Sequence, residues 1–308
     1  MIASLFRKST PFNYTLLIVS VVVFYGIYVL ADTDTPGIIG IIHKISLLGL
    51  QFASLFILNF IVKKNGLSRD NSFTILFYFL FLLFFPSVLS NTNLLLSNFF
   101  VLLSLRRLIS LHSLKAPREK IFDASLWIFV AAIFHFWSIL FLALVFISIF
   151  FHVSRDYRVW IIPFIAAFAA ITVFLMFSLW LDPARIDHVI NGMKLFLRID
   201  YFTDPNQNIA ISMFAPVVVL IFGGTLLGLS NRPLILQSSY KKVISAFVIA
   251  IIIYIISPSK SNDMLIYTFA PLAIMASTLA ENIEEIWKRE ALVTGIALLA
   301  VVAFFIQL

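Results

Sequence analysis

The sequence predicts an all-α protein, a polytopic transmembrane bundle of about eleven spans with short broken helices and one outer amphipathic helix. Composition is the first observation behind this prediction. Hydrophobic residues make up 61% of the 308 residues and charged residues 12%, against roughly 25% charged residues in soluble proteins. The chain has no cysteine, so disulfides, thiolate catalysis and cysteine metal sites are excluded. No linker divides the sequence, and residues 1–308 are expected to form a single integral membrane domain.

A long apolar run, from Phe122 to His152, is the second observation. Basic residues flank it on both sides, in 106–120 and at Arg155 and Arg158. Because basic loops stay cytoplasmic, the run should cross the membrane twice. As one helix, the apolar part of this run is roughly 43 Å long at 1.5 Å per residue, which is too short for two full spans of a roughly 30 Å core. Two short helices that meet at 135–138 solve this problem.

A polar break at membrane depth is tolerated only where it is buried in protein or faces a water-filled cavity. The break at His135-Phe136-Trp137-Ser138 therefore predicts an internal cavity beside His135.

The distribution of basic residues is the third observation, and it orders the spans. The expected spans are about 14–31, 39–62, 72–89, 91–105, 122–136, 138–151, 159–181, 209–229, 243–257, 264–280 and 291–307. The first span follows Arg7 and Lys8. The later loops on the cytoplasmic side hold pairs such as Lys63-Lys64 and Lys241-Lys242. This arrangement puts 17 of the 22 basic residues inside, whereas a single crossing by 122–152 leaves only 14 inside. We expect a bacterial inner-membrane protein with a cytoplasmic N-terminus and an outer C-terminus.

The one sizeable segment between spans is 182–208, on the outer side. Asp182-Pro183 is a good N-cap and first-turn pair. Apolar residues then recur at helical spacing (Ile186, Val189, Ile190, Met193 and Phe196), with basic and polar residues between them. The pattern predicts an amphipathic helix over 183–199 that lies on the membrane surface.

Two acidic residues, Asp32 and Asp34, follow the first span directly. Paired carboxylates at a membrane surface can coordinate a divalent metal ion or act as a general base. The alternative is a solvated turn that ends the span at Pro36.

His135 is the second candidate. A histidine at membrane depth is a functional candidate by default, and it could donate to a phosphate or a sugar hydroxyl. The alternative is a hydrogen bond to a backbone carbonyl that the break releases.

Basic residues of the outer segments are the third group of candidates. Arg185, Lys194 and Arg198 could bind a lipid phosphate, and otherwise they mark an ordinary interfacial helix. Lys260, in the loop before Tyr267, could also serve a phosphate as a point charge, and otherwise it belongs to a short hairpin loop. The inner cluster at 106–120 is interpreted as a topological signal.

Two features that the sequence lacks narrow the classes of function. No span carries an acidic or basic residue near its centre, which ion-coupled transporters and pumps normally need. No Walker-type loop is present, so nucleotide hydrolysis is excluded. Basic residues confined to short loops give no nucleic-acid signal.

The layout resembles the GT-C class of membrane glycosyltransferases. Four parts carry the resemblance: the acidic first outer loop, the asparagine-rich entry NTNLLLSNFF, the break at His135, and the late stretch SPSKSNDMLIYTFAPLAIMA. The late loop of that class often has Arg-Tyr where this chain has Met264 and later Tyr267. The chain also resembles a family of bacterial multi-pass inner-membrane proteins, which implies a location and no activity.

The GT-C resemblance implies a polyprenyl-phosphate sugar as donor. Asp32 or Asp34 would activate the acceptor hydroxyl or hold a divalent metal ion, and His135 would assist. Arg185, Lys194, Arg198 or Lys260 would hold the leaving phosphate, with Tyr267 nearby. Two alternatives stay open: a non-catalytic subunit or scaffold bound to other envelope proteins, and a transporter of lipids or lipid-linked saccharides.

Overall fold

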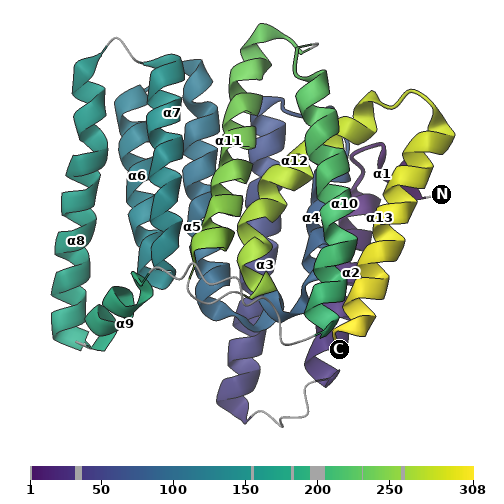
Figure 1. Cartoon of the computed structure of the whole chain (residues 1–308), viewed down its shortest axis with the longest axis horizontal. Helices are drawn as coiled ribbons and strands as arrows, with labels where there is room; N and C mark the ends of the chain where they lie inside the picture. Colours follow the sequence, from purple (N-terminus) through teal and green to yellow (C-terminus); the bar gives the residue numbers. More distant parts are fainter. Residues whose placement is uncertain are drawn as a thin grey trace.

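The computed structural model describes residues 2–31, 37–153, 156–181, 184–194, 205–230, 232–257 and 261–308, except the side chains of His188 and Ile235. Every regular element in this part of the chain is a helix, and the helices run roughly side by side in a bundle (Figure 1). The all-helical fold is thereby confirmed.

Each of the eleven expected spans corresponds to a helix. The long elements are α2 (Pro11–Ala31), α3 (Ile38–Asn65), α4 (Phe73–Phe84), α5 (Thr92–Ile109), α6 (Pro117–Phe134), α7 (Leu142–His152), α8 (Ile162–Leu181), α10 (Pro205–Gly228), α11 (Leu234–Ile256), α12 (Ile266–Asn282) and α13 (Ile286–Ile306). The short elements are α1 (Ile2–Phe6), α9 (Ala184–Gly192) and the 3-10 helices η1 (Pro86–Ser90), η2 (Ser110–Ser113), η3 (Phe136–Phe141), η4 (Tyr157–Ile161) and η5 (Asn262–Leu265).

Within the described residues, eight helices are long and apolar enough to cross a membrane. The segments 73–84 and 136–152 are apolar but shorter. α6 is 18 residues long and carries four charged residues, Arg118, Glu119, Lys120 and Asp123. The chain is therefore a multi-pass membrane protein, and the finer count of eleven spans stays a prediction.

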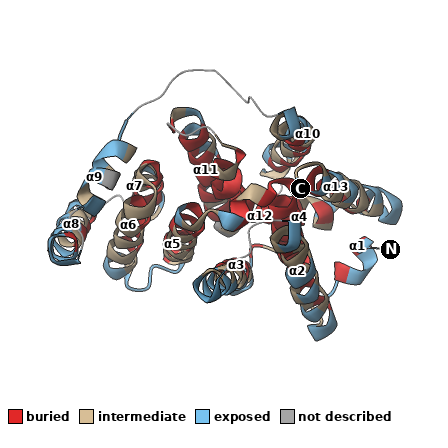
Figure 2. Cartoon of the chain, turned by 90° about the horizontal axis from the view of Figure 1, so that it is seen from below, coloured by how far each residue is buried: buried red, intermediate tan, exposed pale blue. Residues whose placement is uncertain are grey.

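α4 and α12 form the centre of the bundle (Figure 2). All twelve residues of α4 are buried, as expected of a helix that is apolar all round. Where α4 meets α10 and α12, Phe85 stacks on Phe269 at a centroid distance of 6.1 Å, and Phe214 contacts Phe85 edge-on at 5.1 Å. α8 lies at the edge of the bundle and exposes large apolar side chains such as Phe168 and Trp180, which suits a lipid-facing helix.

The break predicted in the apolar run is present. α6 ends at Phe134, His135 is extended with φ −144° and ψ 105°, and η3 leads into α7. Arg118, at the start of α6, forms an ion pair of 2.8 Å with Asp156, just after α7. The hydrogen bond that the Arg118 guanidinium donates in this pair lowers the pKa of the Asp156 carboxyl. The ion pair places both flanks of the run at the same end of the bundle.

The two ends of the bundle carry different residues. The His135 end carries residue 135, the start of α5 at 91–93 and η5 at 262–265. The basic end carries residues 106–120. In Figure 1 the His135 end is at the bottom and the basic end at the top.

The expected amphipathic helix at 183–199 is shorter than predicted. α9 ends at Gly192, and Met193 and Lys194 are no longer helical. A glycine costs about 1 kcal/mol relative to alanine within a helix, which favours an end at this position. α9 packs against α8 and η3, while Ile190 stays exposed.

Candidate functional site

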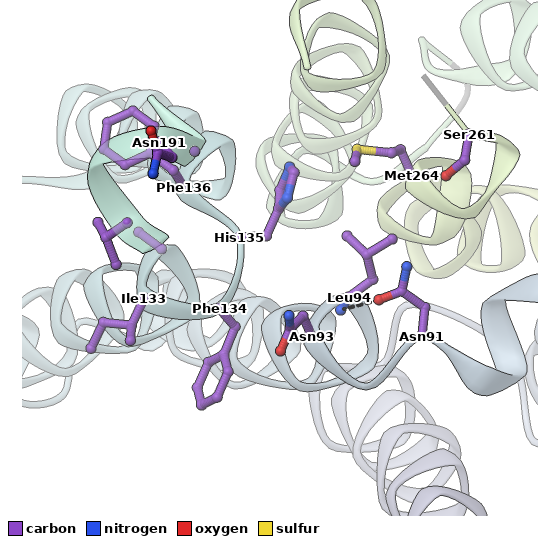
Figure 3. A pocket seen from close by; sticks show the side chains of 13 residues that line it. Asn91, Asn93, Leu94, Ile133, Phe134, His135, Phe136, Asn191, Ser261 and Met264 are labelled. Atoms are coloured by element: carbon purple, nitrogen blue, oxygen red, sulfur yellow. Dashed lines mark hydrogen bonds between the residues drawn. The ribbon is translucent and has the colours of Figure 1, made fainter. Parts of the chain in front are cut away.

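A pocket with a volume of about 340 Å³ opens at the break after α6. This volume lies in the range of roughly 300–1,000 Å³ found for small-molecule sites. Four segments of the chain contribute its walls, namely 91–94, 132–136, 189–192 and 261–264 (Figure 3). The lining residues are Asn91, Asn93, Leu94, Ala132, Ile133, Phe134, His135, Phe136, Val189, Asn191, Gly192, Ser261 and Met264. The cavity expected beside His135 is thus present.

One wall of the pocket is held in place by Asp263. The Asp263 carboxylate accepts hydrogen bonds from the hydroxyl of Ser87 and, at 3.3 Å, from the side-chain amide of Asn91. Asn91 also caps α5, because its side-chain oxygen accepts from the backbone N–H of Leu94 at 3.3 Å. Asp263 therefore ties η1, η5 and the start of α5 together and orients Asn91.

The break itself carries unpaired polar atoms. Nε2 of His135, Nε1 of Trp137 and the hydroxyl of Ser138 are all buried without a hydrogen-bond partner in the described part of the chain. A buried polar group without a partner costs about 1–3 kcal/mol, and such groups are uncommon in folded proteins. Figure 3 shows the His135 ring between Phe136 on one side and Met264 on the other. A polar ligand in this pocket could supply the missing partner of His135.

An apolar groove adjoins the pocket. Its volume is about 400 Å³, and its walls come from α5, α6 and α8. Ile133 and Phe134, at the end of α6, line both the groove and the pocket. The exposed side chain of Arg185 lines the groove at the start of α9. The polar pocket and the apolar groove are therefore two compartments that share one wall.

The other candidates of the sequence fall in different places. Tyr267 lines neither cavity: it is buried, its hydroxyl donates to Ser97 at 2.7 Å, and its ring lies 5.9 Å from the His135 ring. Lys194 is exposed and also lines neither cavity. Four candidates lie outside the described residues: Asp32, Asp34, Arg198 and Lys260.

No cluster of His, Asp and Glu within the described ranges could hold a metal ion. The metal site expected at Asp32 and Asp34 lies outside those ranges.

Sequence reasoning missed three polar residues of this end: Asn191, Ser261 and Asp263. Each lies in a segment that was predicted to bind phosphate through a neighbouring basic residue, Lys194 or Lys260. Their position beside the ends of apolar helices could have indicated them, because polar residues at this level of a membrane protein can contact polar ligands.

The chain matches no protein-family model, no curated protein and no solved structure.

Proposed function

We propose that the protein binds a lipid-linked, phosphorylated sugar at its His135 end and transfers the sugar to an acceptor hydroxyl. One observation carries the proposal: a polar pocket and an apolar groove share the wall formed by Ile133 and Phe134. A ligand that fills both must have a polar head and a long apolar tail.

The lining side chains suit such a head. Asn91, Asn93, Asn191 and Ser261 offer amide and hydroxyl groups that can bond sugar hydroxyls in both directions. Arg185 lies on the groove, where its guanidinium can bind a phosphate between the head and the tail. The tail then lies along α6 and α8, next to lipid.

The transfer breaks the bond between the anomeric carbon of the sugar and the phosphate oxygen, and it forms a bond to the acceptor oxygen. The lipid phosphate leaves with the bonding electrons, so it needs charge stabilisation, which we assign to Arg185. The proton of the acceptor hydroxyl passes to a general base. His135 is the base candidate on the pocket wall, and the resemblance to GT-C enzymes adds Asp32 and Asp34, as bases or as metal ligands.

The test uses the full chain in phosphatidylcholine vesicles that contain a polyprenyl-phosphate sugar, with an alcohol added as the acceptor. Donor binding and release of polyprenyl phosphate are measured separately. Arg185→Gln should weaken donor binding. His135→Gln should leave binding within a few-fold and lower turnover by roughly 10²–10⁴-fold, the usual contribution of a general acid or base. Lys194→Gln, which removes a charge from the same segment, should behave as the wild type.

Absence of donor binding would refute the proposal. Donor binding that responds to Arg185→Gln, without turnover in any condition, would favour a non-catalytic subunit that holds the lipid. Turnover that survives His135→Gln but is lost in Asp32→Asn or Asp34→Asn would move the role of base to the acidic loop.

A further inference from the structure

A second pocket lies at the basic end, at the opposite end of α5 from His135. Its volume is about 420 Å³, and it lies between the ends of α3 and α5, η2 and the start of α6. Its lining residues are Lys64, Asn65, Arg106, Arg107, Ser110, His112, Ser113, Lys115 and Lys120. Five of these nine are Lys or Arg, and none of them is Asp or Glu. The cluster interpreted from the sequence as a topological signal thus forms a shaped, strongly basic pocket.

Most of this charge is not neutralised by the protein. Arg107 pairs with Asp123 at 2.8 Å. The side chains of Lys64, Arg106 and Lys115 form no hydrogen bond or ion pair in the described part of the chain. Cations that line one concave surface create a positive potential that favours an anion.

Two lysines near the end of α5 donate hydrogen bonds to backbone carbonyls. Lys120 donates to the carbonyl of Ser110 at 2.7 Å and to the hydroxyl of Ser113 at 2.8 Å. Lys242 of α11 is fully buried and donates to the carbonyl of Leu108 at 2.6 Å. Neither lysine has a carboxylate partner in the described ranges, and Lys120, which lines the pocket, adds to its positive potential.

The pocket borders on apolar surface. The Phe60 ring lies 5.0 Å from the ammonium of Lys64 and 4.6 Å from the guanidinium of Arg106. Phe60 is exposed, and so is Phe56 one turn earlier on α3. A phosphate in the pocket would therefore have an apolar helix face beside it, along which acyl chains can lie.

We infer that the basic pocket binds a phosphate-bearing anion, held by Lys64, Arg106 and Lys115. An anionic phospholipid headgroup and a soluble phosphate compound share this chemistry, and basic pockets between helices are known to bind lipid headgroups. The site is separate from the His135 pocket and does not depend on the function proposed for it.

The experiment uses the full chain in nanodiscs and has two arms. In one arm, phosphatidylglycerol replaces part of the phosphatidylcholine. In the other, inorganic pyrophosphate is titrated into pure phosphatidylcholine nanodiscs. Thermal unfolding reports stabilisation, and native mass spectrometry counts the bound anion. Each lost cation should weaken binding about fivefold, which corresponds to about 1 kcal/mol per basic residue near an anionic surface.

Three variants sharpen the test. Lys64→Gln combined with Arg106→Gln should weaken binding about 25-fold in the responding arm, and Lys64→Arg should keep it. Arg158→Gln removes a cation that does not line the pocket and should bind as the wild type. If the double variant does not give a monodisperse protein, Lys115→Gln replaces it, because Lys115 is exposed in a loop.

A response only to phosphatidylglycerol identifies a lipid site, and a response only to pyrophosphate identifies a soluble ligand. No response in either arm would overturn the inference. So would a loss in Arg158→Gln equal to the loss in the pocket variants, because the binding would then follow general charge and not the pocket.

Discussion

Replacing Glu281 with alanine should detach the loop between α3 and α4 from the end of α12. The Glu281 carboxylate accepts three hydrogen bonds from this loop. They come from the hydroxyl of Ser68 at 2.6 Å, the side-chain amide of Asn71 at 2.5 Å and the backbone N–H of Arg69 at 3.2 Å. Glu281 is thus the carboxylate that fixes the loop to the central helix α12.

The size of the effect follows from these bonds. A hydrogen bond contributes about 0.5–1.5 kcal/mol net, and this site is only partly buried, so values in the lower half of that range apply. Three such bonds give a loss of about 2 kcal/mol in the free energy of unfolding. For a chain of this size that corresponds to about 4 °C in melting temperature. Glu281→Gln keeps one acceptor oxygen, so its loss should be smaller than that of Glu281→Ala.

The assay is thermal unfolding of the purified protein in one detergent, at one protein concentration. Glu284→Ala is the matched control, since Glu284 is exposed and forms no hydrogen bond or ion pair within the described residues. Equal melting temperatures for Glu281→Ala and Glu284→Ala would refute the assignment of the loop anchor to Glu281.

Two further predictions concern topology and packing. Because the chain has no native cysteine, single cysteines at Lys115 and Arg158 should react with an impermeant reagent from one side of the membrane, and a cysteine at Ser261 from the other. Reaction of the first two from opposite sides would contradict the hairpin at His135. Tyr267→Phe removes the hydrogen bond to Ser97 and should cost about 0.6 kcal/mol, the average for such bonds between membrane helices, as measured by denaturant unfolding. A loss above about 2 kcal/mol, beyond the largest values of that kind, would show that the Tyr267 hydroxyl does more than this one bond.

Much of the architecture followed from composition and charge alone. The bilayer accepts only segments that satisfy their own backbone hydrogen bonds, so long apolar runs had to be helices. The length of the run at 122–152 and the basic residues on both sides required a break, which the structure has at His135. The sequence did not predict the end of α9 at Gly192, because a glycine and the neighbouring contacts decide where a short surface helix stops.

Tertiary structure alone decided which side chains meet. A helix that is apolar all round does not reveal which face packs against protein and which faces lipid, since both are apolar. Tyr267 is an example, because its hydroxyl donates to Ser97 of α5, a contact that no local pattern indicates. Asp263 and Asn91 are 172 residues apart in sequence, and the hydrogen bond between them holds one wall of the pocket in place. No local pattern links the two residues. The amino-acid sequence determined that this chain is a membrane protein and that its long apolar run is interrupted near His135, because the lipid bilayer imposes both. Which polar groups pair at the helix ends depends on which helices are neighbours, and only the folded bundle decides that.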